Sequence, residues 1–580
     1  MIESGIRVWA PRAARVDLVV GDDAFAMTPE AEGWHRSTRA VLPPEDYGFS
    51  IDGGPTRPDP RSHQQPDGVH GRSRVVDHDA FPWADAGWHG VHLPSCAIYE
   101  LHVGTFSEGG TFDGVIEHLD HLVDLGVGAL ELMPVAGFDG ARGWGYDGVA
   151  LWAVHEPYGG PDGLKRLVDA AHARGLGVVL DVVYNHLGPS GNYLGQLGPY
   201  FDDRHQTPWG AAVNLDGPDS GPVRAFILDN ARHWFERYHV DGLRLDATHA
   251  LIDESAIHLL AELADDVHAL ADHLGRPLWL IAESDRNDPR TVTSRDAGGL
   301  GLHAQWSDDL HHAVHALLTG ERDGYYADFG SVATLAKALR DMFVLDGGWS
   351  QSRRRVVGAP VGDLPRDRFV VCSQNHDQVG NRASGDRLRH VVDPAALRVA
   401  AALVLLAPGI PLLFMGEEWG ASTPFPYFAD ERDPKLDDAV REGRRREFEA
   451  FGWGPEDVPD PLDPETFASA VLRWDEITEP GHGSLLEWYR SLLSLRRARP
   501  DLCDPRPERV SVTFDEDERW LVLTRGATDV VVNLASETVT IPLPTDPHRQ
   551  LLLSSCGRVD LDVACVTLPG ISAIVAARDD

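Results

Sequence analysis

The 580-residue sequence is poor in cysteine and lysine, and each shortage narrows the class of protein. The five cysteines are scattered, odd in number and without metal-ligand spacing: Cys96, Cys372, Cys503, Cys556 and Cys565. We therefore expect neither a disulfide framework nor a zinc site, and a reducing compartment fits. Lysine occurs only at Lys165, Lys337 and Lys435, which we attribute to the bias of a GC-rich genome.

Excess positive charge and long apolar runs are also missing. The formal net charge of -38 argues against nucleic acid or an anionic membrane as a partner, because both select basic surfaces. No run approaches the ~18 consecutive apolar residues of a membrane helix. Residues 1–10 do not show the charged-then-apolar pattern of a leader. We therefore expect a cytoplasmic protein with no membrane partner.

The length predicts more than one domain, and the 43% apolar fraction permits a sizeable core. Short apolar runs separated by turn residues mark both ends of the chain, for example at 6–10, 16–20, 520–524 and 530–533. This pattern of short apolar runs and turn residues predicts all-β domains over residues 1–92 and 501–580.

Between these ends, strand-like runs alternate with helical patterns. The eight expected strands are 97–103, 129–135, 177–183, 240–246, 278–283, 303–306, 369–373 and 411–415. Eight β-α units predict a (β/α)8 TIM barrel over residues 93–500. Two long segments, 137–160 and 187–219, follow strands and are expected to be rim loops. The charged segment 430–463 is expected to be a solvated surface loop.

Polar residues that follow barrel strands are candidates for chemistry. Arg244 and Asp246 stand two apart, so they point to one face of a strand, and the cation favours an ionised carboxylate. The strand ends also carry Asp181 with Asn185 and His186, then Glu283, then His376 and Asp377. A nucleophilic carboxylate and a protonated acid on one rim suit glycoside hydrolysis. Each residue taken alone is more often structural than reactive.

Four segments in this order resemble the signature regions of the α-amylase superfamily, glycoside hydrolase family 13. They are residues 181–186, 242–246, 281–284 and 375–377. The resemblance implies that Asp246 is the nucleophile, Glu283 the general acid/base and Asp377 the residue that grips the hydroxyls of the cleaved sugar. The N-terminal domain would be the carbohydrate-binding-like β-sandwich typical of the superfamily's multidomain members.

The same resemblance assigns five substrate-binding residues. Arg244 would orient Asp246, and Asp181 would support Arg244. His186 and His376 would hydrogen-bond the sugar ring, and Tyr146 would stack under it. No cofactor is implied. The cluster His311, His312 and His315 has no accompanying carboxylate pattern, so we expect no required metal.

Within the superfamily, residues 375–382, 412–420 and 423–425 are similar to those of the maltooligosyltrehalose trehalohydrolases. Such an enzyme hydrolyses the α-1,4 bond next to the terminal trehalose of maltooligosyl trehalose, and its pathway partner would be a maltooligosyl trehalose synthase. A glycogen branching or debranching enzyme is the alternative, although branching enzymes usually carry Ser-His-Asp-Glu where this chain has residues 375–378. A non-catalytic glucan-binding module is disfavoured, because all three candidate catalytic carboxylates are present.

Overall fold

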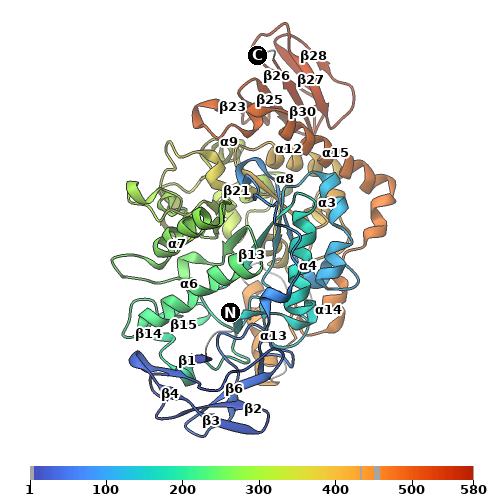
Figure 1. The fold of residues 1–580 in the computed structure, drawn as a ribbon. Coiled ribbons are helices and arrows are strands. Elements are labelled where there is room, and N and C mark those ends of the chain that lie inside the picture. The colour runs from blue at the N-terminus through green and yellow to red at the C-terminus, as the bar shows by residue number, and fades with distance from the viewer. Residues whose placement is uncertain (1–4, 431–433, 450–457, 579–580) are drawn as a thin grey trace.

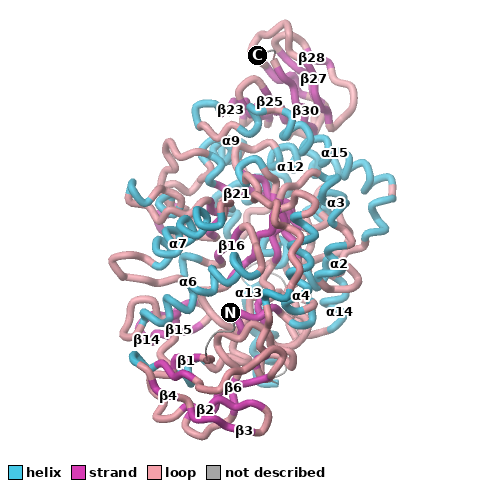
Figure 2. Tube along the Cα trace, in the orientation of Figure 1, coloured by secondary structure: helices cyan, strands magenta, loops and turns pink. Residues whose placement is uncertain are grey.

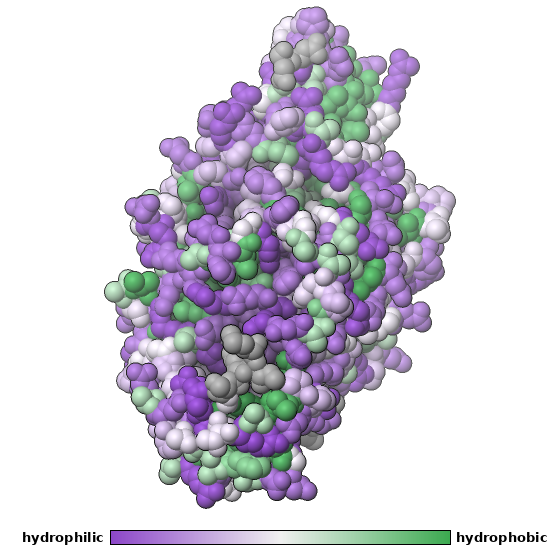
Figure 3. Space-filling model, in the orientation of Figure 1, coloured by the Kyte–Doolittle hydropathy of each residue, from purple (hydrophilic) through white to green (hydrophobic). Residues whose placement is uncertain are grey.

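A computed structural model describes residues 5–430, 434–449 and 458–578. A β-rich N-terminal region, a central barrel and a C-terminal β region follow one another along the long axis of the molecule (Figure 1). The visible face is mainly hydrophilic, with apolar residues in small scattered groups (Figure 3). Among the described residues, no helix has the length and apolar character needed to cross a membrane.

The centre is a closed barrel with strand order β9-β10-β13-β16-β17-β18-β21-β22, and neighbouring strands are parallel. The strands are β9 (Ile98–Leu101), β10 (Ala129–Leu132), β13 (Gly177–Val182), β16 (Gly242–Leu245), β17 (Trp279–Ala282), β18 (Ala304–Trp306), β21 (Phe369–Cys372) and β22 (Ile410–Phe414). All eight expected strands are confirmed, and so is the (β/α)8 TIM barrel.

Helices surround the barrel strands, as the cyan tubes around the magenta centre show (Figure 2). They include α3 (Leu119–Leu125), α4 (Gly160–His172), α6 (Ser220–Arg237), α7 (Leu259–Leu274), α8 (Asp308–Thr319), α9 (Val332–Asp341), α12 (Pro394–Leu405) and α15 (Pro480–Ala498). Gly126 ends α3 in the left-handed conformation, as expected of a helix C-cap.

The two-residue period of the strands stacks the barrel interior in layers. An apolar cluster includes Ile98, Ala129, Val179, Ile281 and Ala304. Two residues further along the same five strands, the same face carries a second layer. It consists of Glu100, Glu131, Asp181, Glu283 and Trp306. Arg244, two residues after Gly242 on β16, joins this second layer. The barrel therefore buries a charged layer directly above an apolar one.

The N-terminal region has two antiparallel sheets, β1-β5-β4 and β3-β2-β6-β7, with β8 paired to β6. Their strands are β1 (Arg7–Trp9), β2 (Val16–Val20), β3 (Asp23–Ala26), β4 (Thr28–Pro29), β5 (Trp34–Arg36), β6 (Asp46–Ile51), β7 (Thr56–Arg57) and β8 (Ser73–Arg74). Arg61 then pairs with Asp229 of α6 at 2.8 Å, and Trp88 Nε1 donates to Asp241 at 2.8 Å. These contacts tie the region to the barrel.

The C-terminal region packs two antiparallel sheets, β23-β24-β25-β30-β27 and β26-β29-β28. The strands are β23 (Val510–Asp515), β24 (Trp520–Arg525), β25 (Thr528–Asn533), β26 (Val539–Pro542), β27 (Gln550–Ser554), β28 (Asp560–Leu561), β29 (Cys565–Leu568) and β30 (Ser572–Ala577). Val522, Val531 and Ile574 pack in one cluster with Ile541 and Val566 of the smaller sheet. The alternate residues of the larger sheet belong to the main core.

Three expected loops contain regular structure. Segment 137–160 includes most of the pair β11 (Ala136–Gly137) and β12 (Ala150–Val154), and segment 187–219 holds the hairpin β14 (Phe201–Thr207) and β15 (Gly210–Val213). The loop prediction for 430–463 is wrong over α13 (Pro434–Glu449), although residues 431–433 and 450–457 lie outside the described residues. The boundaries 1–92, 93–500 and 501–580 stay predictions.

Candidate active site

Among the described residues of the second layer of the barrel interior, Arg244 is the one cation, and its side chain is fully buried. Its Nη1 lies 2.8 Å from Asp181 Oδ2 and 2.9 Å from Asp246 Oδ1. Its Nη2 lies 3.7 Å from Glu283 Oε2. Trp306 covers the guanidinium, with its ring centroid 4.4 Å from Cζ. One buried guanidinium thus gathers carboxyl groups from three adjacent strands.

Asp246 stands one residue beyond β16 and is held from two directions. Arg244 donates to Oδ1, while Asn185 Nδ2 donates to Oδ2 at 2.7 Å. Asn185 Nδ2 also lies 2.8 Å from the Asp246 carbonyl oxygen, so side chain and backbone are fixed by one amide. Hydrogen bonds to the charged form stabilise a carboxylate. Asp246 is therefore held as an oriented carboxylate at the strand end.

Glu283 occupies the matching position, one residue beyond β17. Burial raises its pKa to about 8; Arg244 opposes this rise, whereas the carboxylates of Asp246 and Asp377 add to it. The desolvation penalty and the two like charges outweigh the single cation at 3.7 Å. The Ala247 backbone N–H donates to Glu283 Oε2 at 2.5 Å, from a left-handed residue with φ of 38°. Glu283 therefore holds its proton near neutral pH.

Tyr146 and His376 form one wall beside this cluster. Tyr146 Oη donates to Asp181 at 2.5 Å and lies 2.7 Å from His376 Nε2, and the two rings stack with centroids 5.1 Å apart. Gly145 sets the approach of Tyr146: its φ is +96°, and a Cβ there would lie 2.4 Å from the Pro134 carbonyl oxygen. Burial raises the pKa of Asp181 to about 6, against the pull of Arg244.

His376 is charged at neutral pH although it is buried. Burial by itself would lower its pKa, but the carboxylates of Asp377 and Glu100 outweigh that effect and raise the pKa to about 9. Glu100 Oε1 lies 2.5 Å from His376 Nδ1, and Glu100 Oε2 accepts the His376 backbone N–H at 2.9 Å. Asp377 Oδ1 lies 3.5 Å from His376 Nε2, and this carboxylate keeps 40% of its side chain exposed.

His186 contacts the backbone of Tyr146. Its Nδ1 contacts Asn185 Oδ1 at 2.5 Å, and its Nε2 lies 3.1 Å from the Tyr146 carbonyl oxygen. Trp209, at the tip of the β14–β15 hairpin, stacks on the His186 ring at 4.7 Å and is 48% exposed. All eight site residues predicted from the sequence therefore join one continuous set of contacts around Arg244.

Sequence reasoning missed two buried carboxyl groups of this layer. Glu100 and Glu131 are register partners on β9 and β10, and both are 1% exposed. Burial, then the neighbouring Glu100, raises the pKa of Glu131 well above its ordinary value, so Glu131 is neutral. The available signal was a lone acid inside each apolar strand, since such a residue is rarely buried without a partner.

The two glutamates after β22 serve a different purpose. Glu417 accepts from Ser373 Oγ at 2.5 Å and from Tyr489 Oη at 2.9 Å. Glu418 Oε1 contacts Tyr99 Oη at 3.2 Å and His121 Nε2 at 2.9 Å. These carboxyl groups satisfy buried donors that join β22 to β9, α3 and α15.

A family model described as "Alpha amylase, catalytic domain" matches residues 65–203, and one described as "Domain of unknown function (DUF3459)" matches residues 505–575. Together with the eight-stranded barrel and the carboxyl groups at its rim, this match defines a glycoside hydrolase of the α-amylase superfamily.

Relatives narrow the class. The malto-oligosyltrehalose trehalohydrolase of Rhizobium sp. (strain M-11) is 50% identical over 578 residues, which cover 98% of this chain and 96% of the relative. The one of Saccharolobus solfataricus is 45% identical and covers 93% of this chain and 92% of its own length. The chain therefore belongs to the malto-oligosyltrehalose trehalohydrolase family.

Solved structures agree on the fold. A Salmonella typhimurium protein described as an alpha amylase superposes with a TM-score of 0.90 at 37% identity, covering 99% of this chain and 97% of that one. A pullulanase from Paenibacillus barengoltzii superposes with a TM-score of 0.71 at 20% identity, covering 99% and 94%. At that identity the likeness concerns the fold alone.

Proposed function

We propose that the chain is a retaining α-glycosidase that hydrolyses the α-1,4 bond next to the terminal trehalose of maltooligosyl trehalose and releases free trehalose. The observation that carries the chemistry is the pair Asp246 and Glu283 on neighbouring strands, both facing the Arg244 guanidinium. One carboxylate is fixed by donors and the other holds a proton, which is the asymmetry that two-carboxylate glycoside hydrolysis requires. The substrate is proposed from the names of the relatives.

In the first step, an Asp246 oxygen attacks C1 of the glucosyl residue joined to trehalose. The bond from C1 to the trehalose O4 breaks, and Glu283 gives its proton to that oxygen. In the second step, water attacks C1, Glu283 takes a proton from the water, and the Asp246 carboxylate leaves. Two inversions at C1 give overall retention, and one water is consumed for each trehalose released.

The remaining residues position the sugar. Asp377 and the His376 imidazolium present an acceptor and a donor for the hydroxyls of the cleaved ring, and Tyr146 offers an aromatic face. The resemblance also assigns His186 to this ring, although both of its ring nitrogens contact carbonyl oxygens, those of the Asn185 side chain and the Tyr146 backbone. Asp181 keeps Arg244 in place through contacts of 2.8 and 2.9 Å to Nη1, so its effect on the sugar is indirect.

The substrate chemistry implies an enzyme that converts the reducing end of an α-1,4-glucan into trehalose, and we propose a maltooligosyl trehalose synthase as the pathway partner. The cytoplasmic location stays a prediction from the sequence. A branching enzyme from Salinibacter ruber is 26% identical over 574 residues, well below the 44–50% of the trehalohydrolases. The latter identity favours hydrolysis next to trehalose over branching.

Product analysis tests this proposal. Maltotetraosyl trehalose should yield equimolar trehalose and maltotetraose, with the new reducing end first appearing as the α anomer by proton NMR. The variant Asp246→Asn, purified in parallel, is the matched control and should release neither. New α-1,6 branches from amylose, or a first product in the β configuration, would refute the proposal.

A further inference from the structure

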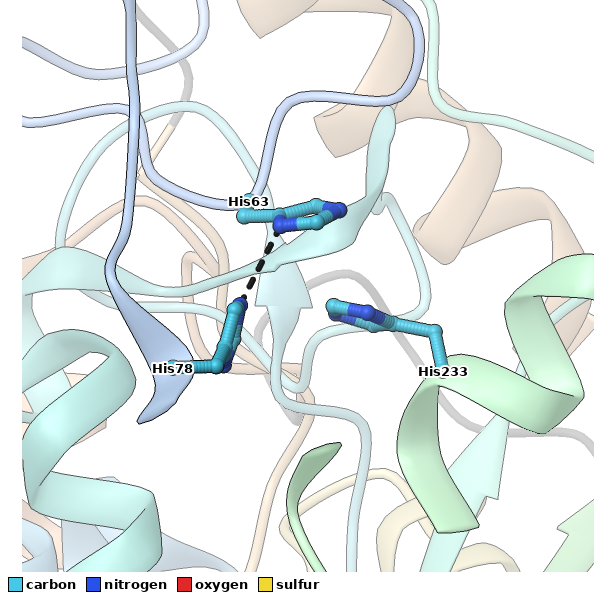
Figure 4. A group of neighbouring side chains, drawn as sticks. All are labelled: His63, His78 and His233. Carbon is cyan, nitrogen blue, oxygen red and sulfur yellow. Dashed lines mark hydrogen bonds between the residues drawn. The ribbon is translucent and has the colours of Figure 1, made fainter. Parts of the chain in front are cut away.

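Three histidines meet where the N-terminal region contacts the barrel (Figure 4). His63 lies between β7 and β8, His78 begins the 3-10 helix His78–Ala80, and His233 projects from α6. One ring nitrogen from each lies within 4.8 Å of the others. We propose that His63, His78 and His233 bind one divalent transition-metal ion of the zinc, cobalt or nickel class, and that the ion joins the N-terminal region to the barrel.

The donors suit such an ion because all three are imidazole nitrogens. The proton that His78 Nε2 and His63 Nδ1 share in a hydrogen bond would be released when the metal binds. Imidazole nitrogen is a preferred ligand of zinc, nickel and copper.

The hydrogen-bond inventory leaves room for an ion. His233 is 5% exposed, yet its Nε2 is buried and has no hydrogen-bond partner. Buried polar atoms of this kind are uncommon and call for a ligand or a water. The His233 ring also packs against Trp152, with the ring centroids 5.2 Å apart.

The spacing is close to that of a tetrahedral site. His78 Nε2 and His63 Nδ1 are 3.1 Å apart. Zinc–nitrogen bonds of 2.0–2.1 Å place two ligands of a tetrahedron about 3.4 Å apart. One edge of the ligand triangle is therefore nearly formed, and the ring of His233 points from α6 toward this pair (Figure 4). A three-histidine face would require the His233 nitrogen, now within 4.8 Å of the other two, to move toward them, and water would be the fourth ligand.

The neighbouring charges are partly paired. Three cations lie close enough to act on His63: Arg237, Arg61 and Lys165. Asp79 lies 3.4 Å from Arg237, Asp229 lies 2.8 Å from Arg61, and the exposed Asp162 lies 4.0 Å from Lys165. These carboxylates reduce, without cancelling, the positive potential that a bound dication would meet.

A second group of potential ligands, Asp202, His205 and Asp216, is already engaged by a cation of the protein. The Arg204 guanidinium donates to both of its carboxylates. The two carboxylates are therefore committed to a cation of the protein, and this group serves as an internal control.

Equilibrium binding of Zn2+ to the full-length, chelator-stripped protein tests the proposal. We expect one equivalent bound, a raised Tm in Zn2+, and an affinity reduced at least about tenfold in His63→Gln, His78→Gln and His233→Gln. The controls are His205→Gln, in the second group, and His89→Gln, at an exposed histidine, and both should bind as the unchanged protein does. Circular dichroism verifies that each variant is folded. Hydrolytic turnover is a second check, because none of the substituted residues belongs to the candidate active site.

Co2+ supplies a readout that does not depend on any variant. The unchanged protein should develop the visible absorption bands of tetrahedral cobalt, and one equivalent of Zn2+ should remove them. Absence of these bands, or one equivalent of Zn2+ bound equally well by all three glutamine variants, would overturn the proposal and leave the three rings as apolar packing.

Discussion

The two ends of strand β16 carry aspartates in opposite circumstances. Asp241, just before the strand, accepts four hydrogen bonds or ion pairs from separate segments, with distances of 2.8 to 3.0 Å. The four donors are Trp88 Nε1, His172 Nε2, the Val178 backbone N–H and Arg276 Nη1. Asp246, just after the strand, shares its cation with Asp181 and faces a second acid, Glu283.

The surroundings of Asp241 favour a structural role, and those of Asp246 favour a chemical one. At the Asp241 end every lone pair of a buried carboxylate has a donor, which is how a charge is buried for structural purposes. At the Asp246 end, carboxyl groups crowd around one guanidinium, and Glu283 and Asp181 take raised pKa values. Perturbed carboxyl groups of this kind mark a reactive site. Barrels follow the same division between their two faces.

The largest effect on turnover is expected from Asp246→Asn. The amide cannot form the glycosyl ester, so kcat should fall by at least about 10^4-fold. Because Arg244 keeps Asp181 as a partner, the Tm should change little. Steady-state kinetics and calorimetry on one preparation measure both quantities. Retention of more than a few per cent of kcat would exclude Asp246 as the nucleophile.

Glu283→Gln should lower kcat by roughly 10^2- to 10^4-fold, because the amide cannot protonate the leaving oxygen. In the unchanged enzyme, kcat/KM should decline as pH rises through about 8, where Glu283 loses its proton. A pH–rate profile from pH 4 to 10 measures this limb. An alkaline limb that persists unchanged in the residual activity of Glu283→Gln would assign it to another group.

The same shift links Glu283 to stability. Between its ordinary value of 4.5 and about 8, the folded state binds more protons at Glu283 than the unfolded state does. The contribution of Glu283 to the free energy of unfolding therefore falls as pH rises through that window. Denaturant unfolding at both ends of the window, with Glu283→Gln as the reference, should show a smaller loss in the variant.

Glu100→Gln should have a smaller effect on turnover, about 10- to 100-fold, because it loosens His376 rather than removing a reacting group. His376 stabilises the fold fully below its ordinary value of 6.5 and loses that contribution as pH rises through about 9. Without the Glu100 charge, the pKa of His376 should fall, so the variant should lose this stabilisation at a lower pH. A pH titration of the Tm detects the change, and identical titrations in both proteins would contradict the role of Glu100.

Asp241→Asn should affect turnover least. It leaves His172 and Arg276 facing an amide instead of a carboxylate, so the free energy of unfolding should fall by about 3 kcal/mol. The folded fraction should keep kcat within about twofold, because the change lies at the far end of the strand. Asp246→Asn measured beside it should show the reverse pattern. If both variants lost turnover equally, the division between the two ends would fail.

Periodicity predicted the barrel well, because each barrel strand is a short apolar run followed by a polar group. The eight strand-end and loop residues named from the sequence lie together in the structure, and their roles stay predictions. Helix α13 was missed because its sequence is so charged, although Arg, Glu and Lys are good helix formers. The β14–β15 hairpin was missed because Phe201–Thr207 is almost entirely polar. In both cases the charged or polar sequence was interpreted as a loop, whereas the backbone preferences of the residues favoured a helix or a strand.

Other features depend on closure of the fold. Glu100 and Glu131 meet only because β9 and β10 pair in register, and neither residue is recognisable as a partner from spacing alone. The three clustered histidines come from a loop, a 3-10 helix and a barrel helix, so no sequence motif joins them. This cluster could not be weighed when no required metal was predicted, because ligand spacing is visible only when ligands lie close in the chain.

Trapping the covalent intermediate tests the central claim most directly. Glu283→Gln incubated with α-maltosyl fluoride should form a glycosyl ester, because fluoride leaves without a proton, but the variant has no base to activate the water that would hydrolyse it. Proteolysis and mass spectrometry should place one maltosyl group on Asp246. An ester on any other carboxylate, or fluoride release with no trapped ester, would contradict the account.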